Sequence, residues 1–270
     1  MATLYDMHVH TTSSPDSDLG GEELVELALE DNLAGVGVVA HVDAHPEDYC
    51  SNSFEPEVYD AETNSTRRTA ERGGIQILKG VELGEPHRFG GQYVELMRGR
   101  SYDFVTGALH WVDDNLVLEA DCFRSGDRLE IIEEYYRQTL EIVECCDLDV
   151  LAHPGMFRRG LARAGLGHDL DETELWPDLL AEVLQAMIDR GIAMEVNTSG
   201  LRKKEDLIYP GAPLLKLYRE MGGSLVVLGS DTHSGEKAFI GLEKGRKMLE
   251  DCGFESASYY RARVAVPYLI

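Results

Sequence analysis

The sequence predicts an α/β fold in which about seven parallel strands close into a barrel. Short apolar runs rich in β-branched residues alternate with amphipathic stretches along the chain, and this alternation is typical of consecutive βα units around a parallel sheet. The chain has 270 residues, of which 43% are hydrophobic, enough for one large α/β domain or two small ones. With about seven βα units in one chain, a closed barrel is favoured over an open sheet.

The apolar runs and the amphipathic stretches set the expected elements. We expect strands at 3–9, 35–40, 75–82, 103–109, 148–152, 192–197 and 225–230, and helices at 21–32, 57–73, 127–146, 173–190, 211–222 and 236–252. Segments 42–56 and 154–172 are expected to be long loops of the kind that wall an active site. Neither a low-complexity linker nor a shift in composition divides the sequence, so a single domain over residues 1–270 is predicted.

Charge and cysteine usage narrow the class of protein. The formal net charge is −24, from 49 acidic and 25 basic residues, which disfavours nucleic acid as a partner. No apolar run approaches the roughly 20 residues that span a bilayer, and the N-terminus has no signal-peptide pattern. The five cysteines form no CxxC pair, so packing roles in a reducing compartment are expected. The sequence therefore predicts a cytoplasmic protein without a membrane segment, disulfides or a thiolate zinc site.

Two histidines end the first predicted strand, in Asp6-Met7-His8-Val9-His10. Side chains at i and i+2 of a strand point to the same face, so His8 and His10 are expected to lie side by side, an arrangement typical of a divalent metal site. For an isolated motif, two solvated histidines at a polar strand end are the favoured interpretation. The combination returns after the last predicted strand as Asp231-Thr232-His233, and this recurrence favours metal binding.

A histidine, aspartate or glutamate lies at the C-terminal end of nearly every predicted strand. The C-terminal ends of the strands are where a parallel barrel builds its active site. Nitrogen and carboxylate ligands without a thiolate suit Zn, Mn or Fe better than Ca or Mg, and about nine ligands are too many for one ion. The residues at the strand ends are His8, His10, His41, Glu82, His110, His153, Asp231 and His233.

Five motifs in the same order resemble the polymerase-and-histidinol-phosphatase (PHP) superfamily, from residue 6 to about residue 245. They are Asp6-Met7-His8-Val9-His10-Thr11, Gly80-Val81-Glu82, Gly107-Ala108-Leu109-His110, Ala152-His153-Pro154 and Gly229-Ser230-Asp231-Thr232-His233. The resemblance implies a distorted (β/α)7 barrel with two to three divalent ions at the C-terminal ends of the strands.

The resemblance also implies a ligand set. The first ion would be held by His8, His10, Glu82 and Asp231, and Glu82 would bridge to a second ion held by His110 and His153. Asp16, His41 and His233 would hold the third. For Asp16 an Asx turn after Pro15 is the alternative, and Asp18 lies close by; metal binding by Asp16 is favoured.

Two segments with cations just past strand ends resemble the histidinol-phosphate phosphatase branch of this superfamily. They are His153 to Arg159 and Met194 to Lys204, and the resemblance implies that Arg158 and Arg202 bind the substrate phosphate, for which arginine has matching geometry. A solvated basic patch is the alternative. The sequence departs from the branch at two points, since no Thr-Glu precedes His41 and Pro154-Gly155 follows His153.

These features predict a metal-dependent phosphomonoesterase that hydrolyses L-histidinol phosphate to L-histidinol and phosphate, by attack of a metal-bridging hydroxide. Asp231, His233 or His41 would position or donate the proton for the leaving group, and the sequence does not choose among them. One alternative is a phosphoesterase of the same superfamily that acts on nucleotides or another small phosphate ester. A non-catalytic metal-binding regulatory protein is a third. The oligomeric state is left open, and Glu85 and Asp113 are candidates for reading the imidazole and amine of the substrate.

Overall fold

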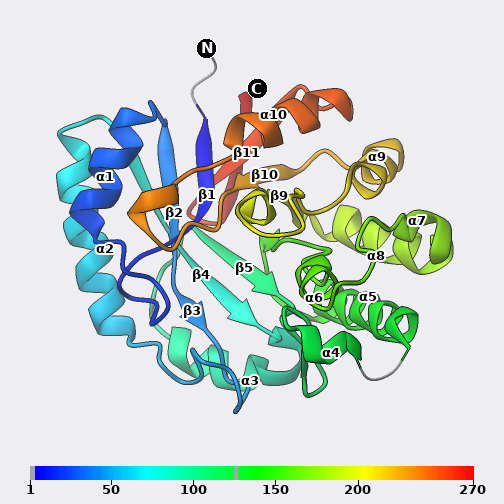
Figure 1. Cartoon of the computed structure of the whole chain (residues 1–270). Coiled ribbons are helices and arrows are strands. Elements are labelled where there is room, and N and C mark those ends of the chain that lie inside the picture. The colour runs from blue at the N-terminus through cyan, green and yellow to red at the C-terminus, as the bar shows by residue number, and fades with distance from the viewer. Residues whose placement is uncertain (1–3, 125–126) are drawn as a thin grey trace.

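A computed structural model describes residues 4–124 and 127–270 and confirms the predicted fold class. Seven parallel strands form a nearly closed barrel with helices around it (Figure 1). All seven predicted strands are present, although residue 3 of the first prediction lies outside the described residues. In their order around the barrel the strands are β1 (Tyr5–His10), β2 (Gly35–Val39), β4 (Gln76–Gly84), β5 (Phe104–Ala108), β8 (Val150–Leu151), β9 (Ala193–Asn197) and β10 (Val226–Gly229).

The barrel closes where the segment after β10 meets β1. The backbone N–H of Asp231 donates to the His8 carbonyl at 2.8 Å, and the N–H of His10 donates to the Thr232 carbonyl at 2.8 Å. A short strand β3 (His41–Val42) extends the top of the barrel by pairing with β4. The two motifs His8-Val9-His10 and Asp231-Thr232-His233, from opposite ends of the chain, therefore lie side by side where the barrel closes.

The helices agree with the sequence in part. The predicted helix 173–190 is interrupted at Pro177, because proline starts a new helix more readily than it continues one. The predicted helix 236–252 begins only at Leu242, after Phe239 and Gly241 take positive φ angles. The helices are α1 (Gly21–Glu30), α2 (Pro56–Glu71), α3 (Pro86–Met97), α4 (Ala120–Arg124), α5 (Arg128–Cys145), α6 (Arg158–Arg163), α7 (Glu172–Leu175), α8 (Pro177–Arg190), α9 (Ala212–Glu220) and α10 (Leu242–Asp251), with 3-10 turns η1 (Ser199–Arg202) and η2 (Gly235–Lys237).

Three helices and two hairpins were not predicted. Helix α3 contains Gly90 and Gly91, which weaken its helical signal, and α4 and α6 are short. Helix α6 lies inside the segment expected to be a loop. The hairpins are β6 (Trp111–Val112) with β7 (Asn115–Leu116), and β11 (Ser256–Arg261) with β12 (Val264–Leu269).

Large apolar side chains fill the N-terminal half of the barrel interior. The ring of Phe104 lies where a Cβ on Gly37 or Gly80 would collide with it, so these two glycines make room for it. Tyr260 of the C-terminal hairpin joins the same buried cluster, and Tyr259 stacks on Tyr5 with ring centroids 4.2 Å apart. The C-terminal segment therefore packs against its own barrel.

A local irregularity in β1 turns its histidines into the barrel. Met7 packs in the interior cluster, so strict alternation would direct His8 outward. The pairing of β1 with β2 shifts register between Asp6 and Val9, and such a bulge re-aims the side chains that follow it. His8 and His10 consequently face the C-terminal half of the interior. Within the described ranges, none of the helices combines the length and apolarity that a membrane span requires.

Candidate metal centre and phosphate site

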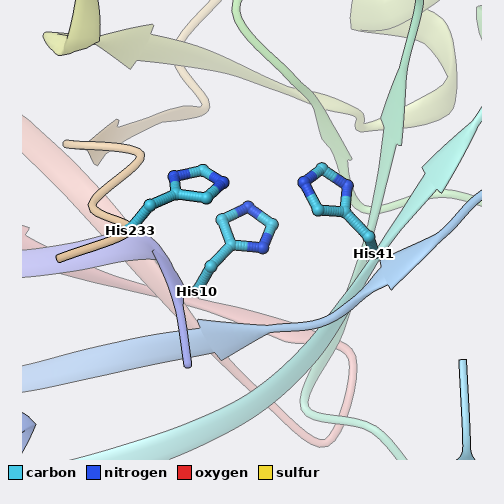
Figure 2. Close-up of side chains that lie close together, drawn as sticks. All are labelled: His10, His41 and His233. Carbon is cyan, nitrogen blue, oxygen red and sulfur yellow. The ribbon is translucent and has the colours of Figure 1, made fainter. Parts of the chain in front are cut away.

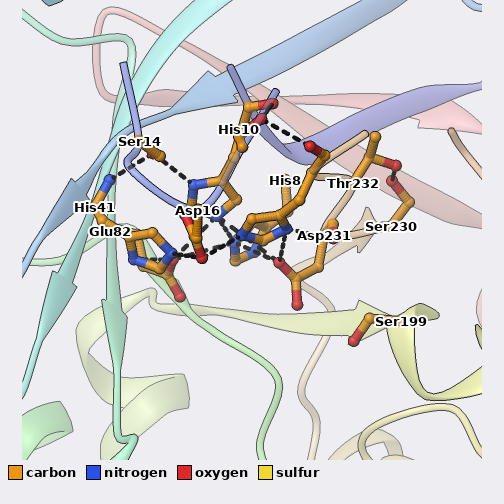
Figure 3. A network of polar contacts seen from close by, with 12 residues as sticks. His8, His10, Ser14, Asp16, His41, Glu82, Ser199, Ser230, Asp231 and Thr232 are labelled. Carbon is orange, nitrogen blue, oxygen red and sulfur yellow. Dashed lines mark hydrogen bonds and ion pairs between the residues drawn. The ribbon is translucent and has the colours of Figure 1, made fainter. Parts of the chain in front are cut away.

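All nine residues predicted as metal ligands come together at the C-terminal end of the barrel. Figure 3 labels His8, His10, Asp16, His41, Glu82 and Asp231 among them. Glu82, from β4, lies at the centre of the group and is 1% exposed. Its Oε2 atom is 3.4 Å from His8 Nε2, 3.3 Å from His10 Nε2 and 3.3 Å from His41 Nδ1. One carboxylate oxygen thus faces three imidazoles from two strands, β1 and β3.

The other oxygen of Glu82 faces a second pair of imidazoles. Its Oε1 atom is 3.0 Å from His153 Nε2 and 3.6 Å from His110 Nε2. A carboxylate with its two oxygens directed to two separate sets of nitrogen donors has the geometry of a bridge between two ions.

Asp16, His41 and His233 form a third group on the more exposed side. The Asp16 Oδ2 atom is 3.1 Å from His233 Nε2 and 3.5 Å from His41 Nε2. Figure 2 shows the rings of His41 and His233 on either side of His10, with ring centroids 4.2 Å from that of His10 in each case. Asp231 Oδ1 joins this group to the first, at 3.4 Å from His233 Nδ1 and 3.8 Å from His8 Nε2. Asp16 therefore faces the cluster, where Asp18 has no such contact.

Glu195 on β9 supports the cluster from below and was missed at the sequence level. Its carboxylate accepts from His8 Nδ1 at 2.8 Å and from the His153 backbone N–H at 2.6 Å. Gly229 is required beside it, since a Cβ there would lie 2.0 Å from Glu195 Oε1. An acidic residue inside the apolar strand Ala193–Asn197 was the available signal.

Ser14 orients one imidazole of the cluster, and Asp43 lies beside another. Ser14 Oγ lies 3.0 Å from His10 Nδ1 and also accepts from the His41 backbone N–H at 3.2 Å. Asp43 Oδ2 lies 3.1 Å from His41 Nδ1. With Nδ1 of His8 and His10 engaged by Glu195 and Ser14, their Nε2 atoms point inward and stand only 3.1 Å apart. Partners of this kind set the tautomer and direction of metal-binding histidines.

Two pKa shifts in the cluster, those of His10 and Glu82, leave these two side chains in the forms that a cation needs. Burial, together with the charges of His233 and His41, lowers the pKa of His10 to about 3, so this imidazole is neutral. Burial raises the pKa of Glu82, but the charges of His8 and His41 outweigh it and hold that pKa well below its usual range. Glu82 is consequently ionised.

The donor set fits divalent cations. Glu82 Oε2 is buried without a hydrogen-bond donor within the described ranges, and it faces inward-pointing Nε2 atoms whose opposite nitrogens are already engaged. A cation placed among them satisfies these atoms together. Cys50 adds an unexpected donor, because its thiol groups with Asp16 and His41 as possible ligands of one ion. The sequence had suggested a ligand set without sulfur.

Beside the cluster lies a cavity of about 350 Å³ with cationic walls. Arg202 from η1 donates through Nη2 to the carbonyls of Ser230 and Asp231 at 2.6 and 2.7 Å, which holds its guanidinium at the edge of the metal cluster. Arg159 lines the same cavity and donates to Ser199 Oγ at 3.0 Å. Lys203 and Lys237 complete the cationic wall. The cavity therefore places four basic side chains next to the ligand residues Asp16, Asp231 and His233.

The structure places Arg158 elsewhere, which corrects the sequence-based assignment. Arg158 is 2% exposed, forms a buried ion pair with Glu172 and donates to the Leu170 carbonyl at 2.8 Å. It lines neither of the two cavities at the metal cluster. Consecutive residues of a helix point about 100° apart, so at the start of α6 only Arg159 of the pair faces the site.

Comparison with known proteins agrees with this arrangement. The sequence pattern of the PHP domain family matches residues 6–199, well over half of the chain. The chain belongs to the PHP domain family. That segment contains seven of the nine clustered residues, and Asp231 and His233 follow it.

Relatives of this PHP domain match along nearly the whole chain. A "probable histidinol-phosphatase" of Clostridium acetobutylicum is 29% identical over 254 residues, covering 93% of this chain and 95% of the relative. The histidinol-phosphatase of Lactococcus lactis is 24% identical over 265 residues, covering 94% and 93%. The crystal structure of the Lactococcus lactis histidinol phosphate phosphatase, complexed with zinc, L-histidinol and phosphate, superposes with a TM-score of 0.85 at 21% identity, covering 98% of this chain and 99% of that one. The superposition shows that the two share a fold.

Proposed function

We propose that this PHP domain is a metal-dependent phosphomonoesterase that hydrolyses L-histidinol phosphate to L-histidinol and phosphate. The observation that carries the proposal is a cluster of nine metal-type ligands that opens directly into a cation-lined cavity of about 350 Å³. Relatives named histidinol-phosphatases match more than nine-tenths of the chain, and one of them has been crystallised with zinc and both products. These support the choice of substrate within the phosphomonoesters.

The chain offers ligands for two to three divalent ions. Glu82, with one oxygen toward His8 and His10 and the other toward His110 and His153, would bridge the first two. When bound, such ions lower the pKa of coordinated water and neutralise charge on the phosphoryl oxygens. Nitrogen and oxygen donors suit Zn, Mn or Fe, and the nearby Cys50 thiol favours Zn among them.

The protein's own cations would hold the phosphate. Arg159 and Arg202 line the cavity beside Asp231, and arginine can grip phosphate oxygens bidentately. The carbonyls of Ser230 and Asp231 hold the Arg202 guanidinium beside the ligand Asp231, where it could reach a phosphoryl group.

The proton for the leaving oxygen has three candidate sources in Asp231, His233 and His41. Asp231 and His233 line both cavities at the metal cluster, whereas His41 lines only the second. We therefore assign the proton transfer to the Asp231–His233 pair, with His41 restricted to holding an ion.

The direct test is phosphate release from L-histidinol phosphate by protein loaded with Zn, Mn or Fe and assayed for bound metal. A panel of sugar phosphates and nucleotides is measured in parallel. The expected result is highest kcat/KM on L-histidinol phosphate with two or more ions per chain. Equal or faster turnover of a nucleotide would reject the substrate, and an inactive protein that binds fewer than two ions would reject the enzyme.

A variant separates metal loss from general damage. His110→Ala is expected to lower metal content and activity together, because His110 faces Glu82 Oε1. His168→Ala is the matched control, since this histidine lies in a surface loop away from the cluster. It should retain both metal and activity.

A further inference from the structure

A second cavity, of about 300 Å³, lies on the other side of the metal cluster and differs in chemistry from the phosphate cavity. The two cavities share Asp16, Arg159, Asp231 and His233 in their walls. They therefore meet at the residues around which the scissile bond would lie. A phosphate ester whose phosphoryl group occupies the cation-lined cavity would place its leaving group in the second one.

One wall of the second cavity is an aromatic platform held rigidly in place. Trp111 is 5% exposed and stacks on His45, with ring centroids 4.0 Å apart and an interplanar angle of 13°. Its Nε1–H donates to Asp48 Oδ2 at 2.8 Å. Leu116 and Met156 border it with apolar surface. A flat ring can pack on such a platform.

The rim of this cavity carries the carboxylates of Glu47 and Asp48. The Asp48 carboxylate is engaged on both oxygens, by Trp111 and by the Cys50 backbone N–H at 2.7 Å. Glu47 also lines the cavity and is exposed. Among the residues that the structure describes, the Glu47 carboxylate takes part in no ion pair or side-chain hydrogen bond. It remains available to a cationic ligand.

We infer that the second cavity is a leaving-group site that selects phosphate monoesters with a planar, positively charged alcohol portion, and that Glu47 is the specificity-determining residue that reads the charge. The inference rests on the proposed function and adds the residues that recognise the substrate. L-Histidinol offers an ammonium group for Glu47 and an imidazole for the Trp111 platform. The phosphoryl group would favour the cation-lined cavity and the ammonium group the cavity with Glu47. This difference would also fix the orientation in which the ester binds.

Glu85 and Asp113, the candidates from the sequence, do not line this cavity. Glu85 is buried and accepts from the backbone N–H groups of His110 and Trp111 at 2.7 and 3.0 Å. Asp113 accepts from Gln138 at 3.1 Å. Glu85 thus positions the segment that carries Trp111, without access to the ligand.

The test compares L-histidinol phosphate with its Nα-acetyl derivative, which lacks the ammonium charge, and with p-nitrophenyl phosphate. In the metal-loaded parent protein, acetylation should lower kcat/KM by up to about fivefold, the strength of an exposed ion pair. In Glu47→Gln the preference for the charged ester should disappear, mainly through KM. Glu47→Asp should restore part of it.

Asp114→Asn is the matched control, because Asp114 is an exposed carboxylate of the neighbouring hairpin that does not line the cavity. It should leave the preference as in the parent protein. If Glu47→Gln keeps the parent's preference while phosphate release continues, this inference is wrong and the proposed function stands. If the parent releases phosphate from p-nitrophenyl phosphate but not from L-histidinol phosphate, both the substrate and this inference are rejected. A parent inactive on all three esters rejects the enzyme itself.

Discussion

Replacing Glu195 by glutamine separates support of the metal ligands from their direct contact with metal. The carboxylate is 1% exposed and receives three donors, from His8 Nδ1 at 2.8 Å, the His153 backbone N–H at 2.6 Å and Asn197 Nδ2 at 3.1 Å. A glutamine has nearly the same shape but only one acceptor oxygen, so its NH2 group must face one of these donors. His8 can relieve the clash only by moving its proton to Nε2, the atom directed at the cluster.

The expected loss of zinc affinity follows from the number of hydrogen-bond donors that Glu195 accepts from. One buried donor left without an acceptor costs about 1–3 kcal/mol, and loss of a partner that orients a metal-binding histidine lowers metal affinity by about 10- to 100-fold. We expect Glu195→Gln to fold, and to bind zinc within that range more weakly than the parent protein.

The assay is zinc content by mass spectrometry after dialysis against a series of chelator-buffered zinc concentrations. Circular dichroism and thermal unfolding of the metal-free protein are measured alongside. Glu182→Gln is the control, because this exposed carboxylate lies on the outer helix α8. Zinc affinity in Glu195→Gln equal to that of the control would refute the reasoning.

Three further outcomes are expected. Arg202→Ala should raise KM for phosphate esters by about tenfold, the value of a hydrogen bond to a charged group, with metal content intact; unchanged steady-state kinetics would remove Arg202 from the site. Arg158→Ala should lower the free energy of unfolding by about 3–5 kcal/mol in urea titrations, because it leaves Glu172 buried and unpaired; a loss below about 1 kcal/mol would contradict this. Burial and the charge of Asp43 raise the pKa of Glu85 from 4.5 to about 8 in the folded protein. The folded state thus holds this proton more tightly than the unfolded state, and the resulting stability is present below pH 4.5 and lost as the pH rises towards 8. Glu85→Gln should remove about 5 kcal/mol of this pH dependence. If urea titrations of the metal-free parent and variant give the same dependence of stability on pH, this prediction is wrong.

Much of the barrel could be predicted from local patterns. The seven strands are short apolar runs, and their positions agree with the structure to within a few residues. The predicted helices agree less well with the structure where local sequence signals conflict. Pro177 divides one predicted helix, and the glycine pair Gly90–Gly91 conceals α3. Such segments are helical because tertiary packing stabilises them, which outweighs weak propensity.

The predicted ligand residues come together because parallel strands are sufficient to bring them to the same end of the barrel. His41, His110 and His153 each follow a barrel strand and Glu82 lies near the end of β4, and parallel strands bring their C-terminal ends to one edge. The bulge in β1 was invisible in the sequence, although it decides that His8 faces inward.

By itself, then, the sequence determined the fold class and which chemical groups gather at one end of the barrel. These depend on periodicity and on the residue that follows each strand, both of which are local properties. Only the tertiary structure decided that Arg159 and not Arg158 faces the phosphate cavity, that Glu195 supports His8 and His153, and that Glu47 borders a second cavity. Those outcomes depend on the angle at which a helix starts and on contacts between residues far apart in the chain. Neither can be inferred from a local sequence pattern.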